Sequence, residues 1–136
     1  MSQVFADTGY WIALLNPRDE LHDRARQISA TLGSTQIVTS EWVLTELLNS
    51  FAERGAQFRS VVSRTVAALR SNPSVIMIPQ TSASFGDAFL LYQDMSDKSW
   101  SITDCSSFLI MRQYGIGAAL THDRHFEQAN FQALLR

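Results

Sequence analysis

Short apolar runs alternate along this chain with longer segments in which apolar residues recur every three or four positions. A short run bounded by turn residues is typical of a buried strand, whereas the longer period indicates an amphipathic helix. The short runs predict four strands and a weaker fifth, at Gln3–Ala6, Gln36–Thr39, Val75–Ile78, Ala118–Thr121 and Phe131–Leu134. Helices are expected in the segment that ends at Leu15 and at residues 21–32, 41–51, 57–71, 82–95 and 103–114.

Strands separated by helices favour a parallel sheet covered on both faces, because parallel neighbours need a crossover that is usually helical. The predicted fold class is therefore α/β. No repeat, low-complexity tract or linker divides the 136 residues, so we expect one domain over residues 1–136. In open sheets of this class, ligands bind beyond the carboxyl ends of the strands, and the chemistry should be sought there.

Composition excludes several classes of protein. With 46% hydrophobic and 18% charged residues, the chain has ample material for a core and is not disordered. The longest apolar run, Tyr10–Leu15, is far shorter than the roughly 20 residues of a membrane-spanning helix. Asp7 interrupts the region where a signal peptide would be apolar. The single cysteine, Cys105, cannot form an intrachain disulfide, so we expect a cytoplasmic protein that does not contact membranes.

Three acidic residues lie at the expected carboxyl edge of the sheet. Asp7 follows the first strand, Asp123 follows the fourth, and Asp104 lies in the first turn of a helix. Each could simply cap a helix, since Asp is a preferred residue at helix N-termini. Their convergence at one edge favours a shared site. Glu46 differs, because a helical wheel places it roughly 130° from the apolar stripe of its helix and predicts exposure to solvent.

Positive charge is local rather than general. The chain has 11 basic and 13 acidic residues, so its overall field does not attract nucleic acid. Arg54, Arg59, Arg64 and Arg70 nevertheless fall in one segment that contains no acid. This segment is either an ordinary solvated helix surface or a contact for RNA phosphates.

The segment TDCSSFLIMRQYGIGAALTHDRHFEQANF, residues 103–131, resembles the C-terminal half of PIN-domain ribonucleases, especially VapC-type toxins. FADTGYWIALLN and SEWVLTELLNSF resemble the two other blocks of that family. Asn130 departs from the glycine that relatives often have before the phenylalanine, which affects a turn and no acid. The resemblance implies a three-layer α/β/α fold around a parallel sheet of four to five strands.

The resemblance also implies a site, an activity and partners. Carried over position by position, the catalytic and metal-binding acids of the family would be Asp7, Glu46, Asp104 and Asp123. Crowded carboxylates repel one another unless a cation compensates them, and Mg²⁺, or alternatively Mn²⁺, prefers such oxygen ligands. The implied protein is a Mg²⁺-dependent endoribonuclease and the toxin of a toxin–antitoxin pair. We expect Asp7 and Asp104 to bind the metal directly.

The remaining expectations concern partners and neighbouring residues. RNA is the expected substrate, with Arg54, Arg59 and Arg64 as candidate phosphate contacts, and an antitoxin the expected protein partner. A homodimer is expected because the apolar residues, Trp11 and Trp42 among them, exceed what one small core plausibly hides. Thr8 and Thr121 are expected to orient the acids through hydrogen bonds. Surface or packing roles are expected for Asp97, His22, His122 and His125.

Two other functional classes would also place acidic residues at the carboxyl edge of the sheet. A receiver-type signalling domain requires a lysine after its last strand and a phosphoacceptor Asp after the third. The only lysine here is Lys98, in a predicted loop, and the third strand ends in Ile78-Pro79-Gln80, which disfavours that class. A catalytically silent PIN-like module that binds RNA or protein remains the alternative to a nuclease.

Overall fold

A five-stranded parallel sheet forms the centre of the computed structural model, which describes residues 2–136. Its strand order is β3-β2-β1-β4-β5, and every neighbouring pair is parallel. The strands are β1 (Gln3–Ala6), β2 (Gln36–Ser40), β3 (Val75–Ile78), β4 (Ala118–Leu120) and β5 (Gln132–Ala133). The α/β class is thus confirmed, and the weakly predicted fifth strand joins the sheet.

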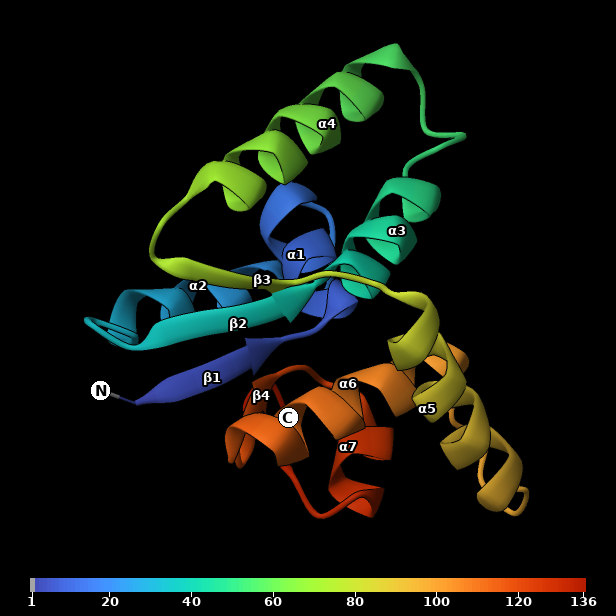
Figure 1. The fold of residues 1–136 in the computed structure, drawn as a ribbon. Helices are drawn as coiled ribbons and strands as arrows, with labels where there is room; N and C mark the ends of the chain where they lie inside the picture. The colour runs from blue at the N-terminus through green and yellow to red at the C-terminus, as the bar shows by residue number, and fades with distance from the viewer. Residues whose placement is uncertain (1) are drawn as a thin grey trace.

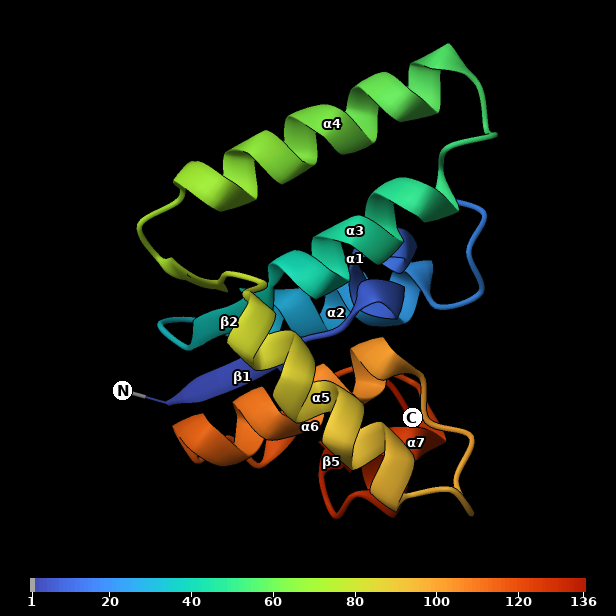
Figure 2. The ribbon, with the colours of Figure 1, turned by 45° about the vertical axis from the view of Figure 1, so that its right-hand side comes forward.

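Seven helices cover the sheet in the described part of the chain. They are α1 (Thr8–Leu15), α2 (His22–Thr31), α3 (Glu41–Ser50), α4 (Ala56–Ser71), α5 (Ser82–Asp94), α6 (Ile102–Tyr114) and α7 (Arg124–Gln128). Helices α1 to α4 lie on one side of the sheet and α5 to α7 on the other, in three layers (Figures 1 and 2). The α/β/α architecture implied by the resemblance is therefore confirmed. The short helix α7 was not expected from the sequence.

The strand order places β1 at the centre of the sheet. The chain builds β2 and β3 on one side of β1 and then returns to add β4 and β5 on the other. The order reverses at β1, and this is the point at which open α/β sheets leave a crevice beyond the carboxyl ends. The site should therefore lie beside the ends of β1 and β4.

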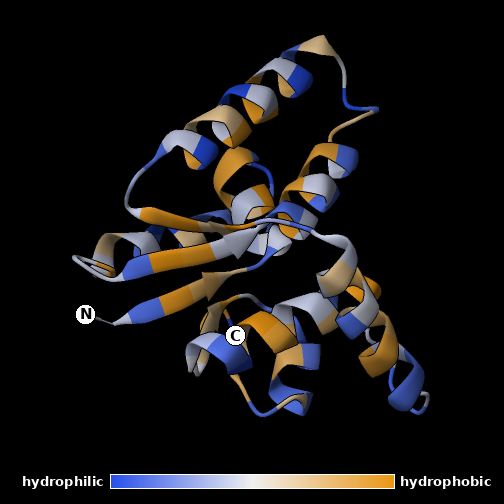
Figure 3. Ribbon diagram, in the orientation of Figure 1, coloured by the Kyte–Doolittle hydropathy of each residue, from blue (hydrophilic) through white to orange (hydrophobic). Residues whose placement is uncertain are grey.

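Apolar side chains of the strands and of the inward helix faces form the core. Figure 3 shows apolar residues along the strands of the sheet. Phe5 of β1, Val38 of β2, Leu47 of α3 and Phe108 of α6 have no exposed surface. Helix α3 begins at Glu41, as predicted, and is capped by Ser40, whose hydroxyl accepts a hydrogen bond of 3.2 Å from the Val43 amide. Such a cap stabilises a helix by about 1 kcal/mol.

The expectation that Trp11 and Trp42 exceed the capacity of the core is wrong. Their exposed fractions are only 6% and 5%. Trp42 stacks on Phe85 of α5 with ring centroids 6.0 Å apart. Helix α5 therefore covers Trp42, a residue that lies outside the apolar stripe of α3. The apolar excess lies instead on α5, in the exposed side chains of Phe85, Phe89, Leu90 and Tyr92. Among residues 2–136, no helix is both long enough and apolar enough to span a membrane.

Candidate active site

Four acidic side chains line one cavity at the carboxyl edge of the sheet. Asp7 directly follows β1, Glu46 lies in the middle of α3, Asp104 in the first turn of α6, and Asp123 directly before α7. The cavity has a volume of about 420 Å³. Segments 116 residues apart in the sequence therefore meet in one place because β1 and β4 are neighbours in the sheet.

Asp7 and Asp104 are the two most buried of these acids, and Asp7 directly follows the central strand. Asp7 is 8% exposed, and its Oδ2 accepts a hydrogen bond of 2.9 Å from the Thr121 hydroxyl. Burial raises the pKa of Asp7 to about 7, against the lowering effect of the Thr8 backbone amide and the Thr121 hydroxyl, and nearby Asp104 and Glu46 raise it further. Although Asp7 occupies the N-cap position of α1, its side chain makes no cap hydrogen bond to any described residue. Helix capping therefore does not account for this buried carboxyl.

Glu46 points into the site, contrary to the solvent exposure that its helical wheel predicts. Its Oε1 accepts a hydrogen bond of 2.6 Å from the Thr8 hydroxyl. The wheel assumes that α3 buries a single stripe, whereas α1 packs against a second side of this helix. Glu46 therefore lies at the cavity, as the resemblance to PIN-domain ribonucleases implied.

Asp104 and Asp123 combine helix capping with a place in the site. Asp104 Oδ2 accepts from the Ser101 amide at 3.1 Å, and the Ser101 hydroxyl accepts from the Asp104 amide at 2.9 Å. Asp123 Oδ1 accepts from the amide of His125 at 2.9 Å. The pKa of Asp104 is raised, chiefly by burial. Both acids are therefore held by local backbone contacts at the mouth of the cavity.

The surface or packing role expected for His125 is wrong, because its side chain lines the cavity beside Asp104 and Asp123. Its Nδ1 lies 3.0 Å from Asp104 Oδ2 and 3.3 Å from Asp123 Oδ1. One potential ligand atom from each of these three residues lies within 4.8 Å of the others. The sequence shows only a histidine two residues after a strand-end acid, and no spacing rule distinguishes it from a surface histidine.

Other predicted residues lie outside the cavity. The guanidinium of Arg54 sits over the rings of Phe51 and Phe58, at 5.8 and 5.1 Å, while Arg59 and Arg64 are exposed on α4. Of the residues that the structure describes, no arginine lines the cavity. The three arginines stay candidate RNA contacts at a distance from the acids.

Asp97 has the surface role expected of it. Its side chain is 70% exposed and forms an ion pair of 2.8 Å with Lys98, which lowers the pKa of its carboxyl. A change at Asp97 is therefore a suitable control for changes at the four acids.

The donor set of the cavity fits a divalent cation. Carboxylate oxygens are the preferred ligands of Mg²⁺ and Mn²⁺. Burial raises the pKa of Asp7, so a positive charge nearby would favour its ionised form. A cation beside Asp7, Asp104, Glu46 and Asp123 would supply that charge.

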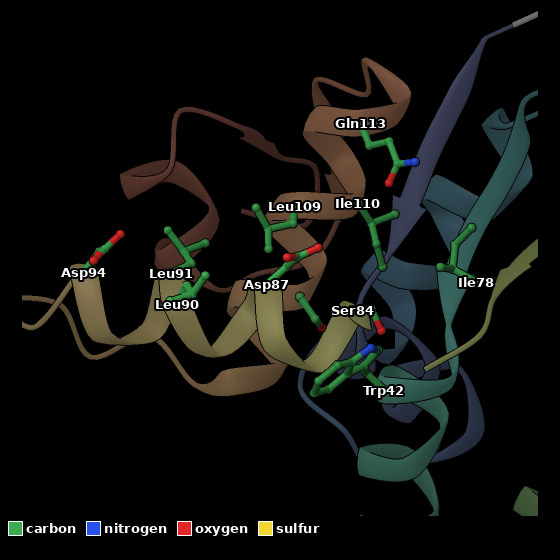
Figure 4. Close-up of a pocket in the computed structure, with 11 residues that line it drawn as sticks. Trp42, Ile78, Ser84, Asp87, Leu90, Leu91, Asp94, Leu109, Ile110 and Gln113 are labelled. Atoms are coloured by element: carbon green, nitrogen blue, oxygen red, sulfur yellow. The ribbon is translucent and has the colours of Figure 1, made fainter. Parts of the chain in front are cut away.

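A separate apolar groove lies between α5 and α6, away from the four acids. It has a volume of about 490 Å³. Figure 4 shows Leu90 and Leu91 of α5 facing Leu109 and Ile110 of α6, with Trp42 at one end. Leu90 lines this groove, whereas Phe89 and Tyr92 line a neighbouring hollow with Met95 and Trp100. We call the exposed apolar side chains of α5, Phe85, Phe89, Leu90 and Tyr92, the α5 surface.

Comparison with known proteins supports the fold and shows the family. The PIN domain family matches residues 4–132. The 23S rRNA-specific endonuclease VapC20 of Mycobacterium tuberculosis is 29% identical over 131 residues, which cover 94% of this chain and 95% of that protein. The crystal structure of VapC20, described as a sarcin-ricin loop cleaving toxin, superposes with a TM-score of 0.83.

A second solved structure supports the fold alone. FitAcB from Neisseria gonorrhoeae is 17% identical and has a TM-score of 0.62, with 96% of this chain and 95% of that chain covered. The family match spans nearly the whole sequence, and the resemblance seen in residues 103–131 extends to both other blocks. This chain belongs to the PIN domain family.

Proposed function

We propose that this chain is a divalent-metal-dependent endoribonuclease and the toxin of a toxin–antitoxin pair. The observation that supports this most is the meeting of Asp7, Glu46, Asp104 and Asp123 in one cavity at the carboxyl edge of the sheet. The likeness to VapC20, an RNA endonuclease, supports the choice of RNA as substrate.

Each acid has a distinct part in the proposal. Asp7 and Asp104, the more deeply buried pair, hold Mg²⁺ or Mn²⁺, while Glu46 and Asp123 complete the site. A divalent cation supplies charge to steady the phosphodiester as it is cleaved and makes water a better nucleophile near neutral pH. Thr121 and Thr8 keep Asp7 and Glu46 directed at the cavity through their hydrogen bonds.

The RNA to test first is 23S rRNA. VapC20 is named for cleavage of that RNA and described as cutting its sarcin-ricin loop, and the two chains match over nearly their whole lengths. The cytoplasm, where ribosomes are found, is the corresponding place of action. The exposed arginines of α4 and of the loop before it would bind those phosphates of such a large RNA that lie outside the cavity.

Two protein partners belong to the proposal. The first is an antitoxin that silences the nuclease. The second is another copy of the chain, docked on the α5 surface, because large exposed apolar patches on a folded protein mark interaction sites. Four large apolar side chains on α5 are between 46% and 60% exposed, more than any other single helix offers in the described residues.

The experiment is the mapping of RNA ends after purified protein is incubated with ribosomes and with naked 23S rRNA in Mg²⁺. We expect new ends at one or a few positions with the wild type, none with Asp104→Asn, and the wild-type pattern with the matched control Asp97→Asn. Binding of RNA without any new end, by a folded wild-type protein in Mg²⁺ and in Mn²⁺, would favour the silent module instead.

A further inference from the structure

The ring of His125 lies between two of the proposed metal-binding acids. Its Nδ1 is 3.0 Å from Asp104 Oδ2 and 3.3 Å from Asp123 Oδ1. Ligand atoms on adjacent corners of an octahedral shell, each about 2.1 Å from the metal, lie about 3.0 Å apart. The nitrogen is thus spaced from both carboxylates as a third ligand would be.

The backbone and core hold this ring in place. The amide of His125 donates to Asp123 Oδ1, which fixes the first turn of α7 against that acid. The next residue, Phe126, is fully buried and packs edge-on against Phe108, with centroids 5.0 Å apart. At the end of α7, Gln128 Oε1 accepts a hydrogen bond of 3.0 Å from Trp100 Nε1. The side chain of His125 is only 21% exposed, so it belongs to the site and not to the outer surface.

The role of Nδ1 depends on which ring nitrogen of the neutral imidazole carries the proton. With its proton on Nδ1, the ring donates a hydrogen bond to Asp104 and is only a support for that carboxylate. With its proton on Nε2, the Nδ1 lone pair faces two carboxylate oxygens, and a cation among the three makes that arrangement favourable. Imidazole nitrogen is the commonest metal ligand among side chains.

We propose that His125 binds the catalytic cation directly through Nδ1, beside Asp104 and Asp123, and that it makes the site prefer Mn²⁺ to Mg²⁺. This inference rests on the cation site of the proposed function. Mg²⁺ takes oxygen ligands almost exclusively, whereas affinity for nitrogen rises across the first-row transition metals. A site of carboxylates alone would discriminate less between the two ions.

The test is pulsed electron paramagnetic resonance of Mn²⁺ bound to the RNA-free protein, which detects a directly bound nitrogen through its hyperfine coupling. We expect nitrogen coupling in the wild type and its loss in His125→Phe. The matched control is His22→Phe, because His22 does not line the cavity and its Nδ1 lies 2.7 Å from the Ala13 carbonyl oxygen; the coupling should persist in it. His125→Asn replaces His125→Phe if the larger change impairs folding.

Titrations that measure the affinity for each cation are the second test. We expect the Mn²⁺ dissociation constant of His125→Phe to rise by about tenfold or more, and the Mg²⁺ constant, measured by competition, to change by less than about threefold. Mn²⁺ binding by the wild type without nitrogen coupling would overturn the inference and leave the proposed function standing. Equal weakening of both ions would likewise overturn it. Failure of the wild type to bind either ion would overturn the cation site of the proposed function as well.

Discussion

Thr8 and Glu46, 38 residues apart in the sequence, are joined by a hydrogen bond of 2.6 Å from the Thr8 hydroxyl to Glu46 Oε1. The bond connects the first turn of α1 with the middle of α3. It directs a carboxylate into the cavity from a helix whose apolar stripe points elsewhere. The place of Glu46 in the site therefore depends on a partner that only the tertiary structure supplies.

Thr8→Val should lower the cleavage rate by about 10- to 100-fold, because it removes the hydrogen bond that orients Glu46 while keeping the shape of the side chain. The cost in unfolding free energy should be only about 1 kcal/mol. Single-turnover cleavage and urea unfolding measure the two effects. The matched control is Thr45→Val, an exposed position of α3 whose hydroxyl donates to the Glu41 carbonyl. Undiminished cleavage by Thr8→Val would show that Glu46 needs no such support.

Asp7 should make the metal-free protein less stable as the pH rises. Its pKa is about 7 in the folded state and near 3.8 in the unfolded chain, so between these values the folded state keeps a proton that the unfolded state has lost. Raising the pH through this window therefore favours unfolding, by up to about 1.4 kcal/mol per pH unit. In chelator, Asp7→Asn should be more stable than the wild type at pH 8, by a margin that shrinks toward pH 5.

Urea unfolding at several pH values between 5 and 8 measures this margin. The control is Asp97→Asn, since Asp97 is exposed and its pKa is lowered, not raised. A margin between Asp7→Asn and the wild type that stays constant with pH would contradict the raised pKa.

Arg59→Ala and Arg64→Ala should weaken RNA binding without changing the cleavage rate of bound RNA. Both side chains are exposed on α4 and neither lines the cavity, so their contribution is electrostatic attraction of phosphates. Each lost phosphate contact should flatten the salt dependence of single-strand binding by about 0.7 in log-log slope. Arg112→Ala, on α6 across the sheet, is the control. Unchanged salt dependence in both α4 variants would remove these arginines from the RNA interface.

Leu90→Glu should convert a dimer into a monomer, because it places a charge in the α5 surface. Leu90 is 60% exposed and lines the groove between α5 and α6. Sedimentation velocity across the micromolar range measures the change. Leu48→Glu, on the exposed side of α3, adds the same charge elsewhere and should leave the dimer intact. A wild-type monomer throughout that range would contradict self-association.

Much of the architecture could be predicted because its signals are local. The strands Gln3–Ala6 and Val75–Ile78 have the expected bounds, since each is a short apolar run between turn residues. Helix α7 was missed because its five residues are too few to show a period. Its supports are the Asp123 cap and the buried Phe126.

The site could be predicted only in part. Asp7 and Asp123 follow from the rule that strand ends meet at one edge, and Asp104 was a candidate as an acid in the first turn of a helix; the structure brings the three together. Glu46 came from family resemblance, because a wheel cannot show that α1 packs beside α3. His125 came from neither, since its contacts with Asp104 and Asp123 depend on how α7 docks. Trp11 and Trp42 were misjudged for a similar reason, because neighbouring elements cover them.

The central claim is that the four acids act by holding a catalytic cation, and cleavage of RNA by metal-stripped protein tests it most directly. We predict no cleavage in EDTA and full recovery on addition of Mg²⁺ or Mn²⁺, but not of Ca²⁺ alone, whose looser coordination activates water poorly. Asp7→Asn should stay inactive with every ion while binding RNA as tightly as the wild type or more tightly, because one negative charge has left the cavity. Full cleavage by the wild type in chelator, or wild-type turnover by Asp7→Asn, would contradict the account.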